Sequence, residues 1–360
     1  MTIAFEKIPH KSPTQADKRA ALMADPGFGK VFSDHMVTIR WTSEKGWHDA
    51  QVRAREPFQI DPAAAVLHYA QEIFEGMKAY RLPDGGFSLF RPEQNARRLN
   101  KSAQRMAMPE VPEELFLAAV DELVKVDADW IPGGEGSFYL RPFMFATEAF
   151  LGVRPANEYI FCVIGCPVGA YFKGGFKTVS VWISEEFTRA APGGTGEAKC
   201  GGNYAASLSA TKEAFDNGCD QVVFLDAVER KYIDELGGMN VFFVMDDRTI
   251  VTPKLGTILP GITRTSIIKL AQEAGYTVKE ELYSFDQWQA DARSGRMREA
   301  FACGTAAVVA GIGTVKYRGG EFAIGNSGDG EATTLLRSKL TGIQRGTVTD
   351  SHGWTRTVTA

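Results

Sequence analysis

Hydrophobic residues in the first 168 positions recur partly at helical and partly at strand spacing, which predicts a mixed α/β region. Helical spacing occurs in three stretches, 63–72, 93–106 and 112–126. Strand-like runs occupy residues 74–80, 87–90, 138–145 and 159–164. The segment Pro83-Asp-Gly-Gly86 separates the first two runs, and this turn composition favours a β-hairpin.

The second half of the chain has the same mixed character. Strands are predicted at 178–183, 221–225, 300–310 and 313–317, and helices at 263–275 and 330–341. Asp246-Asp247 divides the apolar stretch 241–252, as a hairpin turn would. Four glycines and a proline lie between Gly165 and Gly175. We therefore expect a small amino-terminal domain (1–168), a connection (169–177) and a large carboxyl-terminal domain (178–360).

Composition narrows the class of protein. The 360 residues carry a formal charge of −4 without long blocks of one sign, which argues against nucleic acid as a partner and favours a small-molecule substrate. Five scattered cysteines are typical of reduced thiols, and Cys162 and Cys166 lie in an apolar run that does not suggest metal binding. The amino terminus is polar, and no apolar stretch reaches about 18 residues. We expect a cytoplasmic protein without a bound metal.

One lysine stands in an unusually glycine-rich segment. Lys199 lies within Gly193-Gly-Thr-Gly-Glu-Ala-Lys-Cys-Gly-Gly-Asn-Tyr204, where little side-chain bulk would shield it from a ligand. Lysine amines form Schiff bases with carbonyl compounds, pyridoxal phosphate among them. The competing interpretation is a solvated lysine in a loop.

Five other residues could serve such a cofactor. In Pro260-Gly-Ile-Thr-Arg264, the backbone amides of Ile262 and Thr263 could hold a phosphate, or the segment could simply begin a helix. Thr305 follows a glycine that permits close approach of a ligand, or that marks a strand bulge. Glu235 could keep a pyridine nitrogen protonated, or could be solvated. Tyr204 could bond a phenolate oxygen, or anchor a helix start.

With these residues in place, the chain resembles the branched-chain amino-acid aminotransferases, which are pyridoxal-phosphate enzymes of fold type IV. The resemblance extends over nearly the whole length. It is carried by Phe32-Ser-Asp-His-Met36, Leu67-His-Tyr69, Phe74-Glu-Gly-Met-Lys-Ala79, Phe90-Arg-Pro92, Tyr139-Leu-Arg-Pro142, Cys166-Pro-Val-Gly-Ala-Tyr171, the Lys199 segment and Leu259-Pro-Gly-Ile262.

The resemblance assigns roles to individual residues. It implies that Lys199 forms the Schiff base and that Glu235 meets the pyridine nitrogen. Arg98 matches the phosphate-binding arginine, although spacing alone leaves Arg97 as an alternative. Tyr204 matches the position at the cofactor ring oxygen. The positions that match further cofactor-binding residues are Ile262, Thr263 and Thr305, and those that match substrate-binding residues are Phe28, Tyr69, Tyr139, Arg141, Tyr171 and Ala306.

Two departures from the family pattern concern regulation and substrate binding. Mammalian members have a redox-sensitive Cys-x-x-Cys where this chain has Ala307 and Ala310. Thiol regulation by that route is therefore not expected. Gly238 replaces a threonine that lies near the substrate in those members, so carboxylate binding should differ in detail.

The resemblance implies a two-domain α/β fold of the α+β type, whose larger carboxyl-terminal domain has a β-barrel-like sheet, and a homodimer. The implied reaction moves the amino group of L-leucine, L-isoleucine or L-valine to 2-oxoglutarate. A D-amino-acid aminotransferase or an aminodeoxychorismate lyase would share the lysine and the phosphate site. Neither explains the matches at 74–79 and 139–141 together. A pyridoxal-phosphate-binding protein without turnover is the alternative from another class.

Overall fold

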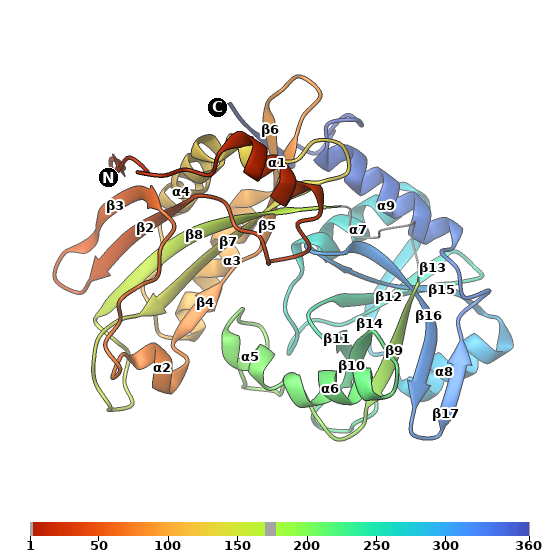
Figure 1. Ribbon diagram of the computed structural model, residues 1–360. Helices are drawn as coiled ribbons and strands as arrows, with labels where there is room; N and C mark the ends of the chain where they lie inside the picture. Colours follow the sequence, from red (N-terminus) through yellow and green to blue (C-terminus); the bar gives the residue numbers. More distant parts are fainter. Residues whose placement is uncertain (1–2, 170–177, 360) are drawn as a thin grey trace. The chain divides into compact units, whose positions relative to one another are not determined.

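The computed structural model describes residues 3–169 and 178–359, which form two compact units (Figure 1). The first unit contains residues 3–169, the short segment Ala198–Gly201 and the chain from Ile343 onward. The second contains residues 178–197 and Gly202–Gly342. Each unit is built around its own sheet.

The sheet of the first unit has nine strands within the described residues, and all pair antiparallel except β1 with β3. Their order is β1 (Glu6–Lys7), β3 (Gly46–Ala54), β2 (His35–Thr42), β8 (Glu158–Val168), β7 (Ser137–Ala146), β5 (Met77–Arg81), β6 (Phe87–Phe90) and β18 (Thr355–Val358), with β4 (Glu72–Phe74) paired to β7. The helices are α1 (Ala16–Ala24), α2 (Ala65–Tyr69), α3 (Pro92–Arg105), α4 (Glu113–Val126) and the 3-10 turn η1 (Ala128–Trp130).

Helix α4 shows why the predicted helices form. Its apolar residues lie on one face and are buried, namely Leu115, Phe116, Ala119, Val120, Leu123 and Val124. Helix α3 differs, because its buried face also carries Asn95, Arg98 and Ser102. Polar groups are buried at a cost unless they are paired, so this face of α3 is a first indication of a functional site.

The sheet of the second unit also has nine strands in the part of the chain that the structure describes, and it curls into a half-barrel. Its order is β11 (Ile233–Leu236), β10 (Gln221–Leu225), β9 (Val179–Ser184), β16 (Val308–Tyr317), β15 (Met297–Gly304), β12 (Asn240–Met245), β13 (Thr249–Pro253) and β14 (Thr277–Glu281), with β17 (Gly320–Ala323) paired to β16. The helices that lie mostly in this unit are α5 (Gly201–Ala205), α6 (Leu208–Asp216), α7 (Ile262–Glu273), α8 (Phe285–Ser294) and α9 (Glu331–Gln344).

Both predicted hairpins are confirmed, since β5 pairs with β6 and β12 with β13. The predicted strand 300–310 is wrong. Strand β15 ends at Gly304, and β16 begins at Val308 opposite it, so the residues between them form a tight turn. Because both strands are buried, their continuous apolar sequence conceals the reversal.

The division into units departs from the predicted carboxyl-terminal domain 178–360. Strand β18 pairs with β6, which places the end of the chain in the first unit. The segment Ala198–Gly201 also joins the first unit, so Lys199 lies there rather than with the second sheet. Most of the predicted connection 169–177 lies outside the described residues. Over the residues that the structure describes, we find no helix that is both long enough and apolar enough to span a membrane.

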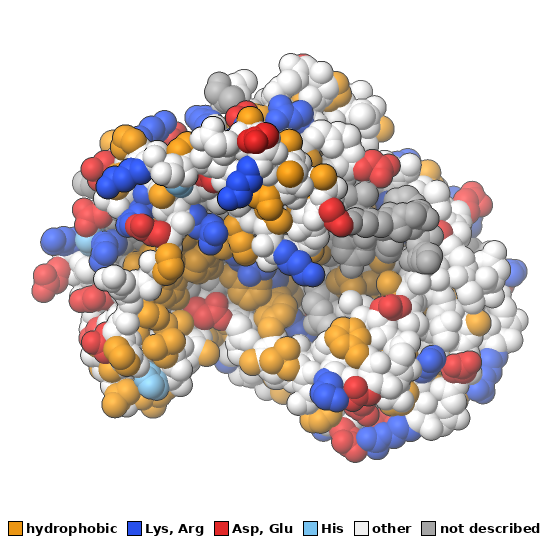
Figure 2. All heavy atoms as spheres, viewed as in Figure 1, with side chains coloured by type: hydrophobic (Ala, Val, Ile, Leu, Met, Phe, Trp, Pro, Cys, Tyr) orange, Lys and Arg blue, Asp and Glu red, His pale blue; other side chains and the backbone are white. Residues whose placement is uncertain are grey.

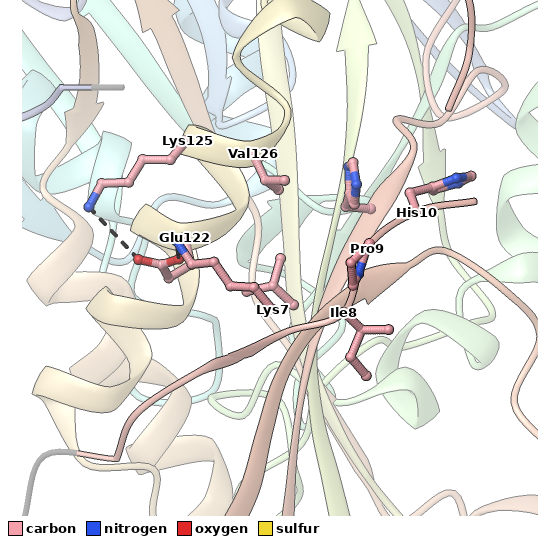
Figure 3. A pocket seen from close by; sticks show the side chains of 9 residues that line it. Lys7, Ile8, Pro9, His10, Glu122, Lys125 and Val126 are labelled. Atoms are coloured by element: carbon pink, nitrogen blue, oxygen red, sulfur yellow. Dashed lines mark ion pairs between the residues drawn. The ribbon is translucent and has the colours of Figure 1, made fainter. Parts of the chain in front are cut away.

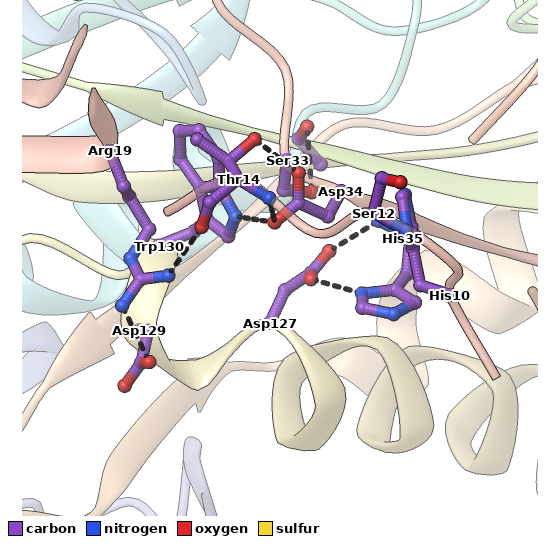
Figure 4. Close-up of polar contacts among 11 residues, drawn as sticks. His10, Ser12, Thr14, Arg19, Ser33, Asp34, His35, Asp127, Asp129 and Trp130 are labelled. Atoms are coloured by element: carbon purple, nitrogen blue, oxygen red, sulfur yellow. Dashed lines mark hydrogen bonds and ion pairs between the residues drawn. The ribbon is translucent and has the colours of Figure 1, made fainter. Parts of the chain in front are cut away.

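A cluster of polar residues links the amino-terminal segment to the first sheet through hydrogen bonds (Figure 4). The Thr14 hydroxyl donates to Asp34 at 2.6 Å, and the Trp130 indole donates to the same carboxylate at 3.0 Å. Beside them, His35 Nδ1 lies 2.7 Å from the Asp127 carboxylate, whose side chain is almost fully buried. A pocket of about 300 Å³ adjoins this cluster, between residues 7–10 and the end of α4 (Figure 3).

Stability should depend on pH through His35. The hydrogen bond and charge of Asp127 raise the pKa of His35 above 6.5, although burial opposes them. The protonated form therefore stabilises the folded state fully below pH 6.5, and this stabilisation is lost as the pH rises through the raised pKa. Urea unfolding from pH 5.5 to 8.5 measures the loss, and His35→Gln should remove it. An unchanged pH dependence in that variant would show that another group is responsible.

Candidate active site

The backbone of Lys199 is fixed between α3 and β4 in the first unit. Its N–H donates to Ser102 Oγ on α3 at 2.9 Å, and its carbonyl accepts from the Phe74 N–H at 2.9 Å. The Ser102 hydroxyl in turn donates to the Arg98 carbonyl one turn earlier, at 3.0 Å. Two residues on, the Gly201 N–H donates to the Glu72 carboxylate. These bonds hold the glycine-rich segment in one position despite its composition.

The side chain of Lys199 is held in surroundings that favour its neutral amine. Its Nζ lies 4.6 Å from the centre of the Phe74 ring. Desolvation, followed by the positive charge of Arg98, lowers the pKa of Lys199 from 10.5 to about 8, with Glu75 acting in the opposite direction. A lysine must lose its proton before it attacks a carbonyl carbon, so this environment suits a nucleophile.

Arg98 lies beside Lys199 in the first unit, and the structure separates it clearly from Arg97. The Arg98 guanidinium donates two hydrogen bonds of 2.8 Å to the Glu75 carboxylate, and both side chains are buried. Arg97 is exposed and pairs with Glu113 at 2.9 Å. Of the two arginines, Arg98 is the one whose charge acts on Lys199.

Three further predicted residues lie in the same cluster. Arg141 donates to the Tyr139 hydroxyl at 3.1 Å, and its guanidinium lies 4.6 Å from the centre of the Phe74 ring. Phe28 packs edge-on against Tyr139, with ring centres 5.0 Å apart. The first unit therefore brings together Lys199, Arg98, Phe28, Tyr139 and Arg141.

Gly76 makes room for the Tyr139 hydroxyl. A Cβ atom at position 76 would lie 2.3 Å from that oxygen. We therefore expect Gly76→Ala to displace Tyr139 and to cost about 1–3 kcal/mol of unfolding free energy. Urea denaturation measures this cost, and Gly152→Ala is the matched control, because a Cβ there has nothing within 4 Å. Equal stability of both variants would contradict the packing described.

Glu235 lies in the second unit and is paired. It stands on β11 with its side chain 2% exposed, and it forms an ion pair with Arg189, which is equally buried. The Arg189 guanidinium also lies 5.4 Å from the centre of the Tyr204 ring. Gly238 lies near Tyr204 as well, since a Cβ there would be 3.5 Å from the ring. The solvated interpretation of Glu235 is therefore wrong.

The other predicted cofactor residues converge around Asn240. Its side-chain amide donates to the Leu259 carbonyl at 3.2 Å, just before helix α7 begins at Ile262, followed by Thr263. Gly261 packs so closely on Asn240 that a Cβ would lie 2.0 Å from the Asn240 Oδ1 atom. Across the sheet Asn240 pairs with Cys303. The β15–β16 turn, which carries Thr305 and Ala306, begins two residues later.

Of the described substrate residues, Tyr69 makes its contacts away from these groups. Tyr69, at the end of α2, donates its hydroxyl to the Leu151 carbonyl and stacks on Phe150 with ring centres 6.5 Å apart. Tyr171 lies outside the described residues.

Sequence reasoning missed three residues that fix the site, namely Glu75, Ser102 and Arg189. Glu75 lies inside the matching stretch Phe74-Glu-Gly-Met-Lys-Ala79, yet nothing in the spacing identified its partner or that of Ser102. Arg189 stands ten residues before Lys199, in a stretch without helical or strand periodicity. A buried charge needs a partner, but burial at these positions is set by tertiary contacts that the local pattern does not encode.

Comparison with known proteins identifies the family. Residues 72–315 match the amino-transferase class IV family. The chain is 55% identical to a probable branched-chain-amino-acid aminotransferase of Streptomyces coelicolor, over 99% of both chains. It is 54% identical to a branched-chain-amino-acid aminotransferase of Mycolicibacterium smegmatis, over 98% of this chain and 97% of that one.

A solved structure agrees. The branched-chain amino acid aminotransferase from Escherichia coli has a TM-score of 0.71 and 27% identity, over 90% of this chain and 100% of that one. The resemblance seen in the sequence and the two-sheet α/β fold are thereby confirmed. The chain belongs to the branched-chain amino-acid aminotransferases of the class IV aminotransferase family.

Proposed function

We propose that the protein is a branched-chain L-amino-acid aminotransferase that uses pyridoxal 5'-phosphate. The observation that carries this proposal is Lys199, whose amine has a pKa near 8 and which is held by its backbone beside Arg98 and Phe74. In a chain of this family, such a lysine is suited to attach an aldehyde cofactor and to transfer a proton.

The residues present fit a phosphorylated pyridine aldehyde. In the first unit, Lys199 would hold the aldehyde carbon and Arg98 would supply a cation for the phosphate. In the second unit, the family resemblance assigns phosphate binding to the amides of Ile262 and Thr263 and to the Thr305 hydroxyl. Glu235, whose charge Arg189 balances, would meet the ring nitrogen. Tyr204 would meet the ring oxygen. When bound, the cofactor supplies an electron sink for the pair of electrons left by the α-proton.

The protein's own groups then have distinct tasks. Lys199 Nζ removes the α-proton of the amino acid and later gives it up again, because its lowered pKa allows both gain and loss of a proton near neutrality. Arg141 would orient a substrate carboxylate, for which the planar guanidinium is suited. Its hydrogen bond to Tyr139 fixes that orientation.

The substrate pocket must accept an aliphatic chain in one half-reaction and the carboxylate of 2-oxoglutarate in the other. The residues we assign to it are Phe28, Tyr69, Tyr139, Arg141, Tyr171 and Ala306. Aromatic walls distinguish side chains that differ by one methylene by only about 1–3 kcal/mol. L-Leucine, L-isoleucine and L-valine should therefore all react.

Glutamate formation from each amino acid with 2-oxoglutarate tests the proposal. We expect L-leucine, L-isoleucine and L-valine to be converted, and D-alanine to be inert. Conversion of D-alanine alone would instead identify a D-amino-acid aminotransferase. Release of pyruvate from aminodeoxychorismate without amino transfer would identify a lyase. Binding of the cofactor without conversion of any of these compounds would identify a non-catalytic protein.

We further propose that the protein is a homodimer. Large apolar side chains are exposed around α2, where Leu67 is 57% exposed, Leu151 68% and Val153 88%. Figure 2 shows hydrophobic side chains gathered on the face where Figure 1 places α2. Exposed apolar groups of this kind are typical of protein interfaces. Light scattering should give twice the mass of one chain, and Leu151→Lys should lower it.

A further inference from the structure

Glu75 is a fully buried carboxylate at the centre of the lysine cluster. Its side chain is 0% exposed. It accepts two hydrogen bonds of 2.8 Å from Arg98, one of 2.8 Å from Asn95 Nδ2 and one of 3.2 Å from the Gly76 N–H. A carboxylate with four donors around it, and without exposure to water, has one fixed position.

Glu75 is also tied to Lys199 through the backbone. The preceding residue, Phe74, donates its N–H to the Lys199 carbonyl at 2.9 Å. The ring of Phe74 also contacts the Lys199 side chain, whose Nζ lies 4.6 Å from the ring centre. Burial would raise the pKa of Glu75, but Arg98, Lys199 and Asn95 together lower it, so the carboxylate is charged. Lys199 thus lies among the cations Arg98 and Arg141, with the charge of Glu75 opposing them.

We propose that Glu75 is a positioning residue for the lysine site, whose carboxylate fixes the guanidinium of Arg98 and supplies the negative charge that balances Arg98 next to Lys199. Without that charge, the positive charges of Arg98 and Arg141 would act on buried Lys199 with no opposing charge from Glu75. The amine would then be neutral over a wider pH range and would hold the transferable proton less well. The inference rests on the proposed role of Lys199.

The test is a titration of the Lys199 amine in the full-length chain freed of cofactor. Trace acetylation at a series of pH values, with mass spectrometry of the Lys199 peptide, gives the pH of half-maximal reactivity. Among the described residues, the charged and titratable groups that act on this amine are Glu75, Arg98, Tyr139 and Arg141. For the unsubstituted chain we expect half-maximal reactivity near pH 8. For Glu75→Gln we expect a value about one pH unit lower, because an adjacent opposite charge has been removed.

Matched variants separate this effect from simple disruption. Glu75→Asp keeps the charge, so its pH of half-maximal Lys199 reactivity should stay close to that of the unsubstituted chain. Glu113→Gln removes the partner of exposed Arg97 and should leave this pH unchanged. If Glu75 had only a structural role, its replacement would loosen the site, and the pH of half-maximal Lys199 reactivity would rise toward 10.5. An unchanged or higher value for folded Glu75→Gln overturns the proposal.

If Glu75→Gln fails to fold, a second comparison decides the question. The double variant Glu75→Gln/Arg98→Met removes both members of the buried pair and is compared with Arg98→Met. We expect the pH of half-maximal Lys199 reactivity to be about one unit lower in the double variant than in Arg98→Met. Equal values in the two variants overturn the proposal. Because no cofactor or substrate is used, failure of this test leaves the assignment of Lys199 as the attachment site intact.

Discussion

Replacing Lys199 with alanine is expected to lower kcat for L-leucine by at least about 10⁴-fold, because one amine both attaches the cofactor and moves the α-proton. The visible absorption of the attached cofactor should also disappear. Stopped-flow and steady-state assays of glutamate formation measure the first effect, and the spectrum of the purified variant measures the second.

Lys212→Ala is the control for this loss. Lys212 is on α6, its side chain is 76% exposed, and it forms a surface ion pair with Asp216. Its replacement should leave kcat and the absorption spectrum unchanged. A positioned acid–base group contributes roughly 10²–10⁴-fold to the rate. If Lys199→Ala kept more than about one hundredth of the activity, another base would have to move the α-proton.

Replacing Arg98 with methionine is expected to destabilise the protein by about 3–5 kcal/mol, because it leaves the Glu75 carboxylate buried without its cation. It should also raise the dissociation constant of pyridoxal phosphate by about 10- to 100-fold, the usual worth of a hydrogen bond to a charged group. Urea unfolding of the cofactor-free chain gives the first quantity, and fluorescence titration gives the second.

The neighbouring arginine provides the control. Arg97→Met removes an exposed cation from the same helix, where water screens the ion pair with Glu113. Both the unfolding free energy and the cofactor affinity should stay within error of the unsubstituted chain. A larger loss of affinity in Arg97→Met than in Arg98→Met would reverse the assignment of the two residues.

The elements with strong periodicity could be predicted from the sequence. Helix α4 and the hairpins β5–β6 and β12–β13 appear where the apolar pattern and the turn residues place them. The turn at Thr305 was missed, because the strands on both sides are buried and carry no alternation. The return of β18 to the first sheet was missed as well, since the pairing of distant strands leaves no local signal.

The candidate residues of the site could be named from the sequence, but their supporting contacts could not. Lys199 and Glu235 were proposed from their residue types and from the resemblance to the family. Their partners, Glu75 and Arg189, depend on which side chains the fold buries together. A lowered lysine pKa would not have identified Lys199 either. Lys78 is also buried, and its pKa is lowered to about 8 by desolvation and by Arg345.

Because Lys199 and Lys78 are both buried and both have a lowered pKa, one measurement is decisive, namely which lysine carries the cofactor. The purified protein, saturated with pyridoxal phosphate, is reduced with borohydride, digested and mapped by mass spectrometry to find the lysine that carries the pyridoxyl group. We predict that the label is on Lys199, and that L-leucine added before reduction prevents the labelling. A label on Lys78 or on another lysine would contradict the assignment of Lys199 and, with it, the mechanism proposed here.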